Sequence, residues 1–144
     1  MKRAILLMTL LAAAGCGSAN STGPSPTSVG VFTMTDLALG TGPTAAVGSR
    51  VTATYAGWLY DTSTADGKGA QFDPGNAPLT FVVGTIGAGG VIRGFDQGVV
   101  GMKVGGQRRV IIPPELAYGN QSPDTTKIPQ NATLVFDITL TAVQ

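Results

Sequence analysis

The chain of 144 residues contains no histidine and a single cysteine. Without histidine it can form neither a Ser-His-Asp or Cys-His relay nor a zinc or haem site with a histidine ligand. One cysteine excludes a disulfide framework, an iron–sulfur cluster and a CxxC redox pair within the chain. Any chemistry at neutral pH therefore proceeds without the side chain that most often moves protons there.

Charge is also scarce. Only 12% of the residues are charged, and nine basic against eight acidic side chains give a net charge of +1. Nucleic-acid binding needs a basic face toward the phosphates, so we expect no nucleic-acid partner. The acidic residues between 61 and 71 do not follow the alternating ligand pattern of a calcium loop, and we expect neither a metal nor a cofactor. Hydrophobic residues make up 43% of the chain, enough for the core of one domain.

The N-terminus has the pattern of an export signal. Lys2 and Arg3 precede an uncharged run over residues 4–15, which ends in small residues directly before Cys16. The run is too short to cross a bilayer as a helix, which takes about 20 residues, and is typical of a secretory signal. The pattern resembles the lipobox of bacterial lipoproteins, although Ala13 stands where that motif prefers leucine.

This resemblance implies a signal peptide at 1–15 that is removed, and lipidation of Cys16 as a membrane anchor. The protein would then face the periplasm or the cell surface. An ordinary signal peptide cleaved nearby, with Cys16 incidental, is the alternative. Residues 16–28 are small, polar and contain proline, which predicts a flexible tether, and the folded domain is expected over 29–144.

Period-two patterns dominate the rest of the chain. In residues 132–143 an apolar face alternates with a polar one and only Val135 breaks the alternation, as expected for a half-buried antiparallel strand. Further strands are predicted at 50–60, 79–83 and 107–112, and a weaker one at 31–39.

One segment changes the period. Ile92, Phe95, Val99 and Met102 are spaced three, four and three residues apart, which predicts a short amphipathic helix on the sheet. Its glycines limit it to two or three turns. Residues 61–71 are polar and are predicted to form a solvated loop. Together the segments predict an α+β fold.

The C-terminal half resembles a known family. The carrying blocks are Val-Ile-Arg-Gly-Phe-Asp at 91–96, Pro-Pro-Glu-Leu-Ala-Tyr-Gly at 113–119 and Ile-Pro-Gln-Asn-Ala-Thr-Leu-Val-Phe-Asp at 128–137, with Tyr-Ala-Gly-Trp-Leu at 55–59 and Phe-Asp at 72–73 upstream. In this order they resemble the FKBP family of peptidyl-prolyl cis-trans isomerases. The resemblance implies a strongly twisted, half-open antiparallel sheet of about five strands wrapped around one short α-helix, with a pocket between them.

The implied chemistry suits a chain without histidine. Rotation about an Xaa-Pro bond moves no proton, and its barrier of about 18–20 kcal/mol is lost amide resonance. An apolar pocket favours the twisted, less polar amide, and fixed donors can hold its carbonyls. The implied substrates are proline-containing polypeptides, including exported proteins that need help in folding. The resemblance also implies a macrolide inhibitor site, and a monomer is the default.

The resemblance assigns roles residue by residue. The Ile92 N–H and the Tyr118 hydroxyl would each hold a substrate carbonyl, and Asp73 would sit beside the Tyr55 hydroxyl and face the amide. The expected substrate-binding residues are Tyr55, Phe72, Phe81, Val91, Phe95, Ile128 on the rim, and Phe136. Trp58 is expected to pack outside the pocket.

Other interpretations of these residues stay open. Phe81, Val91 and Phe136 also fit a plain core, and Asp73 before Pro74 also fits a residue that starts a turn. Two departures from the family pattern bear on the ligand: Phe95 replaces the usual tryptophan, and Lys127 stands where an apolar rim residue is frequent. The alternative functions are a proline-binding or chaperone module without turnover on a membrane tether, and a structural lipoprotein.

Overall fold

The computed structural model describes residues 30–87 and 90–144. The predicted signal peptide, Cys16 and the tether all lie outside the described residues, as does the first residue of the predicted domain. Within the described part no helix is long and apolar enough to cross a membrane.

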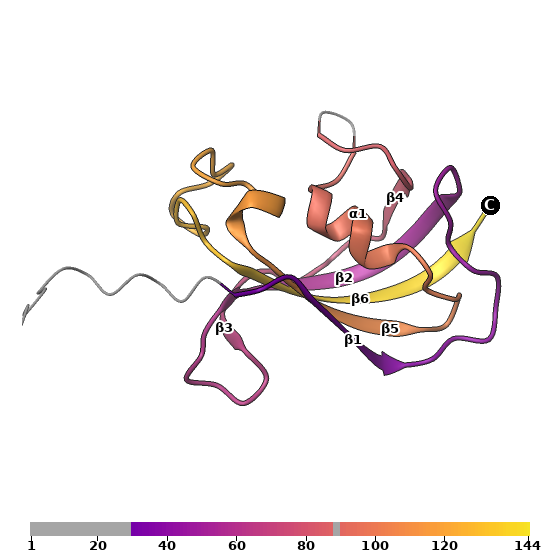
Figure 1. The fold of residues 1–144 in the computed structure, drawn as a ribbon, viewed down its shortest axis with the longest axis horizontal. Helices are drawn as coiled ribbons and strands as arrows, with labels where there is room; N and C mark the ends of the chain where they lie inside the picture. Colours follow the sequence, from indigo (N-terminus) through magenta and orange to yellow (C-terminus); the bar gives the residue numbers. More distant parts are fainter. Residues whose placement is uncertain (1–29, 88–89) are drawn as a thin grey trace, which may run out of the picture.

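Six strands and one α-helix make up the described fold (Figure 1). The elements, with a one-turn 3-10 helix labelled η1, are β1 (Thr33–Ala38), β2 (Arg50–Tyr60), β3 (Lys68–Asp73), β4 (Leu79–Val82), α1 (Arg93–Val99), β5 (Gln107–Ile112), η1 (Pro114–Leu116) and β6 (Leu134–Val143). All strand pairs are antiparallel, in the order β1-β5-β6-β2-β3, and β4 pairs with β2.

The long strand β2 organises the sheet around the site. One of its edges pairs with β6 along nearly its whole length. Its other edge pairs with β4 at Arg50–Ala53 and with β3 at Gly57–Tyr60. Tyr55 lies between these two pairings, at the point where the chain leaves β3 and returns as β4.

Helix α1 packs on the concave face of the sheet (Figure 1), where it contacts β5 and β6. Gly94 and Gly98, four residues apart, share the helix face that meets β5. A methyl group on Gly98 would lie 2.7 Å from Cγ2 of Val110, and one on Gly94 would collide with Ile112. Glycine at both positions therefore allows a backbone approach that any side chain would prevent.

Arg108 fixes the other end of the helix. Its Nη1 donates to the carbonyls of Gly98 (2.9 Å) and Val100 (3.0 Å), which end α1. Its Nε donates to Asp36 on β1 at 2.6 Å. These bonds satisfy carbonyls that a helix end leaves free, and they connect α1 to the sheet through one side chain.

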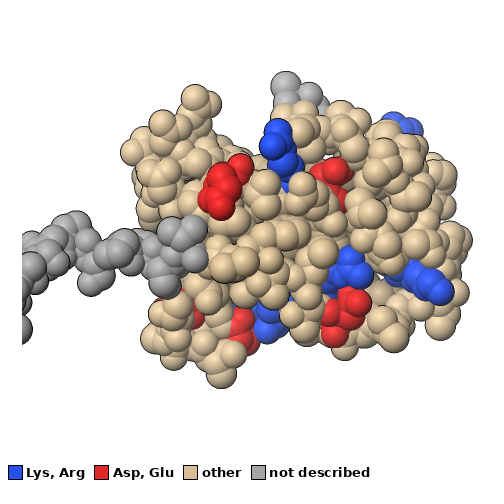
Figure 2. Space-filling model, viewed as in Figure 1, with Lys and Arg blue, Asp and Glu red and all other residues tan. Residues whose placement is uncertain are grey.

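The convex face of the sheet holds a charged network over the single tryptophan. Asp137 on β6 accepts from Arg109 Nε and Nη2 (2.7 and 2.9 Å) and from Lys68 Nζ (2.6 Å). Lys68 Nζ also lies 3.9 Å from the Trp58 ring centroid. Burial alone would raise the pKa of Asp137, but the bonds and charges of Arg109 and Lys68 outweigh it and lower that pKa. Elsewhere charges of both signs are scattered over the face seen in Figure 2.

The predicted α+β architecture is confirmed, as are the strands at 50–60 and 107–112, and the strand predicted at 79–83 ends one residue earlier, at Val82. The helix is shorter than its apolar pattern, since it ends at Val99 and Met102 lies beyond the turn at residues 100 and 101. Val135, the residue that broke the alternation, is fully buried on the opposite face, in register between Trp58 and Ile111. The solvated loop predicted at 61–71 is wrong from Lys68 onward, where β3 begins.

Candidate active site

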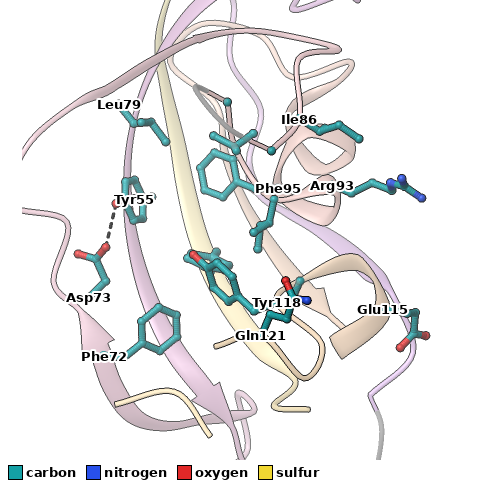
Figure 3. A pocket seen from close by; sticks show the side chains of 16 residues that line it. Tyr55, Phe72, Asp73, Leu79, Ile86, Arg93, Phe95, Glu115, Tyr118 and Gln121 are labelled. Atoms are coloured by element: carbon teal, nitrogen blue, oxygen red, sulfur yellow. Dashed lines mark hydrogen bonds between the residues drawn. The ribbon is translucent and has the colours of Figure 1, made fainter. Parts of the chain in front are cut away.

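A cavity of about 780 Å³ lies between the concave face of the sheet, the start of α1 and the segment that follows η1 (Figure 3). Strands β2, β3 and β6 supply its aromatic side through Tyr55, Phe72 and Phe136, and α1 supplies Phe95. A volume of this size falls within the range of small-molecule sites, about 300–1,000 Å³.

The aromatic rings contact one another edge to face. The Phe95 centroid lies 5.4 Å from that of Phe136 and 5.5 Å from that of Tyr55, with interplanar angles of 87° and 82°. Phe72 meets Phe136 at 5.6 Å and 84°. Edge-to-face pairs are favourable beyond the area that they bury, and they hold each ring in one orientation. The wall of the cavity is therefore formed in advance of any ligand.

Gly57 on β2 makes room for two of these rings. A methyl group at this position would lie 2.7 Å from Phe72 Cζ and 2.9 Å from Phe136 Cε1. Because neither distance leaves space for a carbon atom, any side chain here would displace the aromatic wall.

Asp73, the last residue of β3, is held on both oxygens. Oδ2 accepts the Tyr55 hydroxyl at 2.8 Å, and Oδ1 accepts the N–H of Gly75 at 2.9 Å. Gly75 has φ of +69° and passes so close to the Tyr55 carbonyl that a side chain could not fit. Asp73 thus begins a turn and also orients a cavity tyrosine, so the two interpretations of this residue are compatible.

Hydrogen-bond donors beside the aromatic side of the cavity lack an acceptor in the described part of the chain. The Ile92 N–H, at the residue before α1, and the Tyr118 hydroxyl donate to no other residue among 30–87 and 90–144. Burial, with a smaller contribution from the charge of Asp73, raises the pKa of Tyr118. Burial and then the hydrogen bond and charge of Asp73 raise the pKa of Tyr55 to about 12. Both phenols therefore stay protonated and able to donate at neutral pH.

Comparison with known proteins shows to which family a chain with this cavity belongs. A family model described as FKBP-type peptidyl-prolyl cis-trans isomerase matches residues 42–141. The chain belongs to this family. An FK506-binding protein 1B from Neurospora crassa is 43% identical over 116 residues, which cover 81% of this chain and all of the relative.

Two solved structures agree with the FKBP assignment. The crystal structure of FkpA from Escherichia coli superposes with a TM-score of 0.61 and 34% identity, covering 78% of this chain and 48% of that one. A peptidyl-prolyl cis-trans isomerase from Pseudomonas syringae pv. tomato superposes with the same TM-score and 33% identity, covering 78% of this chain and 75% of that one. The chain thus spans about half of FkpA.

The structure brings most of the residues predicted for the FKBP pocket to one place. They line the cavity together, and they are Tyr55, Phe72, Asp73, Val91, Ile92, Phe95, Tyr118 and Phe136. Two predicted residues do not line it. Phe81 is buried behind Phe95, with the ring centroids 5.9 Å apart, and Ile128 is 6% exposed in the core instead of on the rim. Trp58 lies outside the cavity, as predicted.

Other lining residues were missed by the sequence reasoning. Besides backbone at 87 and 90 they are Leu79, Ile86, Arg93, Glu115, Ala117 and Gln121. Ala117, Glu115 and Arg93 stand within the recognised blocks, so their position beside Tyr118 and Ile92 was the available signal. Nothing in the sequence marks Leu79, Ile86 or Gln121 as lining. Among the described residues no group of three or more His, Cys, Asp or Glu side chains could hold a metal ion.

Proposed function

We propose that this chain accelerates cis-trans rotation about Xaa-Pro bonds in exported polypeptides, and that it does so from a membrane tether at Cys16. One observation supports the catalytic part most strongly. An aromatic cavity carries the Ile92 N–H and the Tyr118 hydroxyl, which donate to none of the described residues, and an Asp73–Tyr55 pair whose geometry is fixed.

The physical chemistry of the bond fits this cavity. Planar amide resonance separates charge, and rotation through the twisted state removes it at a cost of about 18–20 kcal/mol. Transfer from water to an aromatic cavity disfavours the planar, more polar amide relative to the twisted one. Donors that are already in place stabilise the carbonyls of a bound segment without reorganisation. None of these effects needs a general base.

In this proposal the proline ring rests against Phe95 and Phe136, with Tyr55 and Phe72 beside it. Tyr118 and the Ile92 N–H bind carbonyls on either side of the rotating bond. Asp73 acts by orienting the Tyr55 hydroxyl through the 2.8 Å bond and by facing the amide.

The proposal also covers inhibitors of the FK506 type, because the relatives are named for binding FK506. Phe95 keeps the floor apolar, although it lacks the volume and the N–H of tryptophan. Lys127, the other departure, is 63% exposed beside Asp124 and does not line the cavity. We expect FK506 to inhibit by competition with peptide, which inhibition kinetics at several peptide concentrations would measure.

Exchange of an Xaa-Pro peptide, followed by NMR with the purified protein, tests the catalytic proposal. Acceleration of cis-to-trans exchange above the uncatalysed rate, which corresponds to tens to hundreds of seconds, is expected. Peptide binding without acceleration would instead identify a proline-binding module. If the protein neither binds the peptide nor accelerates its exchange, a structural role remains.

The membrane part has its own test, because it rests on the sequence pattern at residues 2–16 alone. Cys16→Ser should move the protein from the membrane fraction to the soluble fraction, since stable anchoring requires the acyl chains. A Ser18→Ala variant, changed within the predicted tether, serves as the control and should stay with membranes. If Cys16→Ser also stays there, the anchor lies elsewhere in the chain.

A further inference from the structure

The rim of the cavity has two opposite charges that the proposed chemistry does not use. Arg93, at the first turn of α1, and Glu115, on η1, both line the cavity and are both exposed. Figure 3 shows them on the side of the cavity opposite Asp73. They do not pair with each other, since no salt bridge joins them within 4.0 Å.

Glu115 is unusual among the acidic residues. Each of the other seven carboxylates, all of which the structure describes, accepts a hydrogen bond from a neighbour. They are Asp36, Asp61, Asp66, Asp73, Asp96, Asp124 and Asp137. Glu115 accepts none from the described residues.

Arg93 is likewise without an ion pair or side-chain hydrogen bond in the described part of the chain. The arginines of β5 differ from it, because Arg108 binds Asp36 and Arg109 binds Asp137. Two charges of opposite sign at the mouth of one cavity, with no partner among residues 30–87 and 90–144, are available to whatever enters that cavity.

The position of Arg93 and Glu115 at the rim limits which parts of a bound polypeptide can reach them. A polypeptide with its proline against the aromatic floor has to leave the cavity over the rim, because the chain continues on both sides of the proline. The side chains that flank the proline then pass the rim, within reach of long side chains such as arginine and glutamate.

We propose that Arg93 and Glu115 select substrates by charge: an acidic side chain is preferred where the substrate passes Arg93, and a basic one where it passes Glu115. The inference rests on the proposed function, and it concerns which proline-containing segments this chain prefers. Exposed ion pairs are screened, so the expected preference at each position is roughly twofold to fivefold in kcat/KM.

A peptide panel tests the proposal. Each peptide has four positions that flank the proline, two before it and two after it. One of the four is Glu, Gln or Lys, and the other three are Ala. We expect one position at which Glu is favoured over Lys and another at which Lys is favoured over Glu. Both preferences should lie mainly in KM, because a rim contact is made equally before and during rotation. Both should shrink at high salt.

Charge reversal identifies the residues. Arg93→Glu should invert the preference for Glu and leave the preference for Lys, whereas Glu115→Lys should do the opposite. Arg50→Glu, which reverses an exposed arginine outside the cavity, is the matched control and should change neither preference. Equal kcat/KM across the panel, or preferences that survive both reversals, would overturn the proposal.

Binding of the same peptides, measured by NMR titration, separates this proposal from the catalytic one. Charge-dependent binding without turnover would contradict the isomerase function and support selection by the rim. Turnover and binding that are both independent of charge would support the isomerase function and contradict selection by the rim.

Discussion

Replacing Gly98 by alanine tests the close packing of α1 on β5. In an exposed helix the change is favourable by up to about 1 kcal/mol, because glycine has the greater backbone entropy when unfolded. Here the new methyl would lie 2.7 Å from Val110 Cγ2, and ordinary contacts begin at 3.4 Å. The helix must therefore move about 0.7 Å from β5, or Val110, which is fully buried, must leave its rotamer.

The expected result is a net loss of stability. Overpacking of this kind costs about 1–3 kcal/mol, which exceeds the gain in helix propensity, so the net loss is about 1 kcal/mol. For a domain of this size that lowers Tm by roughly 3–6 °C. Movement of α1 also shifts Phe95 and the Ile92 N–H, so kcat/KM toward an Xaa-Pro peptide should fall as well.

Urea unfolding followed by Trp58 fluorescence measures the change, since Trp58 is the only tryptophan and lies away from α1. Gln97→Ala, on the exposed face of the same helix, is the control and should be neutral or slightly stabilising. Val110→Ala removes both methyls that the new methyl at position 98 would meet, so the double variant should lose less than the sum of the single variants. Stabilisation by Gly98→Ala would refute the packing argument.

Three further predictions concern single groups. Tyr118→Phe should lower kcat/KM about fivefold in the Xaa-Pro exchange assay, the equivalent of one hydrogen bond of about 1 kcal/mol, with Tm unchanged. Asp73→Asn should lower the pKa of Tyr55 from about 12 toward 10, because the charge of Asp73 and its strong hydrogen bond to the phenol are lost. Burial, the larger cause of the raised pKa, remains, so the pKa should not fall all the way to 10. Phenolate absorbance during an alkaline titration measures the change. Asp137→Asn should make the free energy of unfolding depend less on pH in acid. The pKa of Asp137 is lowered in the fold, so its ionised side chain stabilises the fold above the ordinary pKa of 3.8, and this stabilisation is lost as the pH falls below that value. Urea unfolding at several pH values would show the difference.

The parts of the fold that were predictable have a one-sided apolar pattern. Strand β6 and the first half of β2 alternate because one face of each packs into the core, and burial follows that alternation. Strand β3 has no such pattern. It is an edge strand with two register shifts against β2, the strand directly before it in the chain, and none of its residues is fully buried, so its sequence shows no apolar face.

The site, like the fold, has residues that the sequence predicts and residues that it does not. The aromatic residues were identifiable from the family blocks, because rings inside a recognised motif keep their places. Phe81 and Ile128 could not be separated from the core, since burial and pocket lining select the same residue types. Arg93 and Glu115 lie inside those blocks, yet an exposed charge is so common on protein surfaces that only its position at the cavity mouth distinguishes it.

The glycines of α1 show why a local rule can mislead. Their low helix propensity predicted a weak helix, and α1 is indeed only seven residues long. The same residues nevertheless provide the contact that holds α1 against β5, because a missing side chain is what lets two backbones approach. The packing partner of a glycine is not visible in the sequence around it.

The position of β6 has a consequence for how the chain reaches its folded state. This strand pairs with both β2 and β5, and it is formed by residues 134–143, which are synthesised after both of its partners. Until those residues are available, β2 and β5 have no strand between them, and the apolar face that covers α1 is incomplete. A nascent chain should therefore stay loosely structured until residues 134–143 have been synthesised and then close cooperatively, so that deletion of these residues prevents folding altogether.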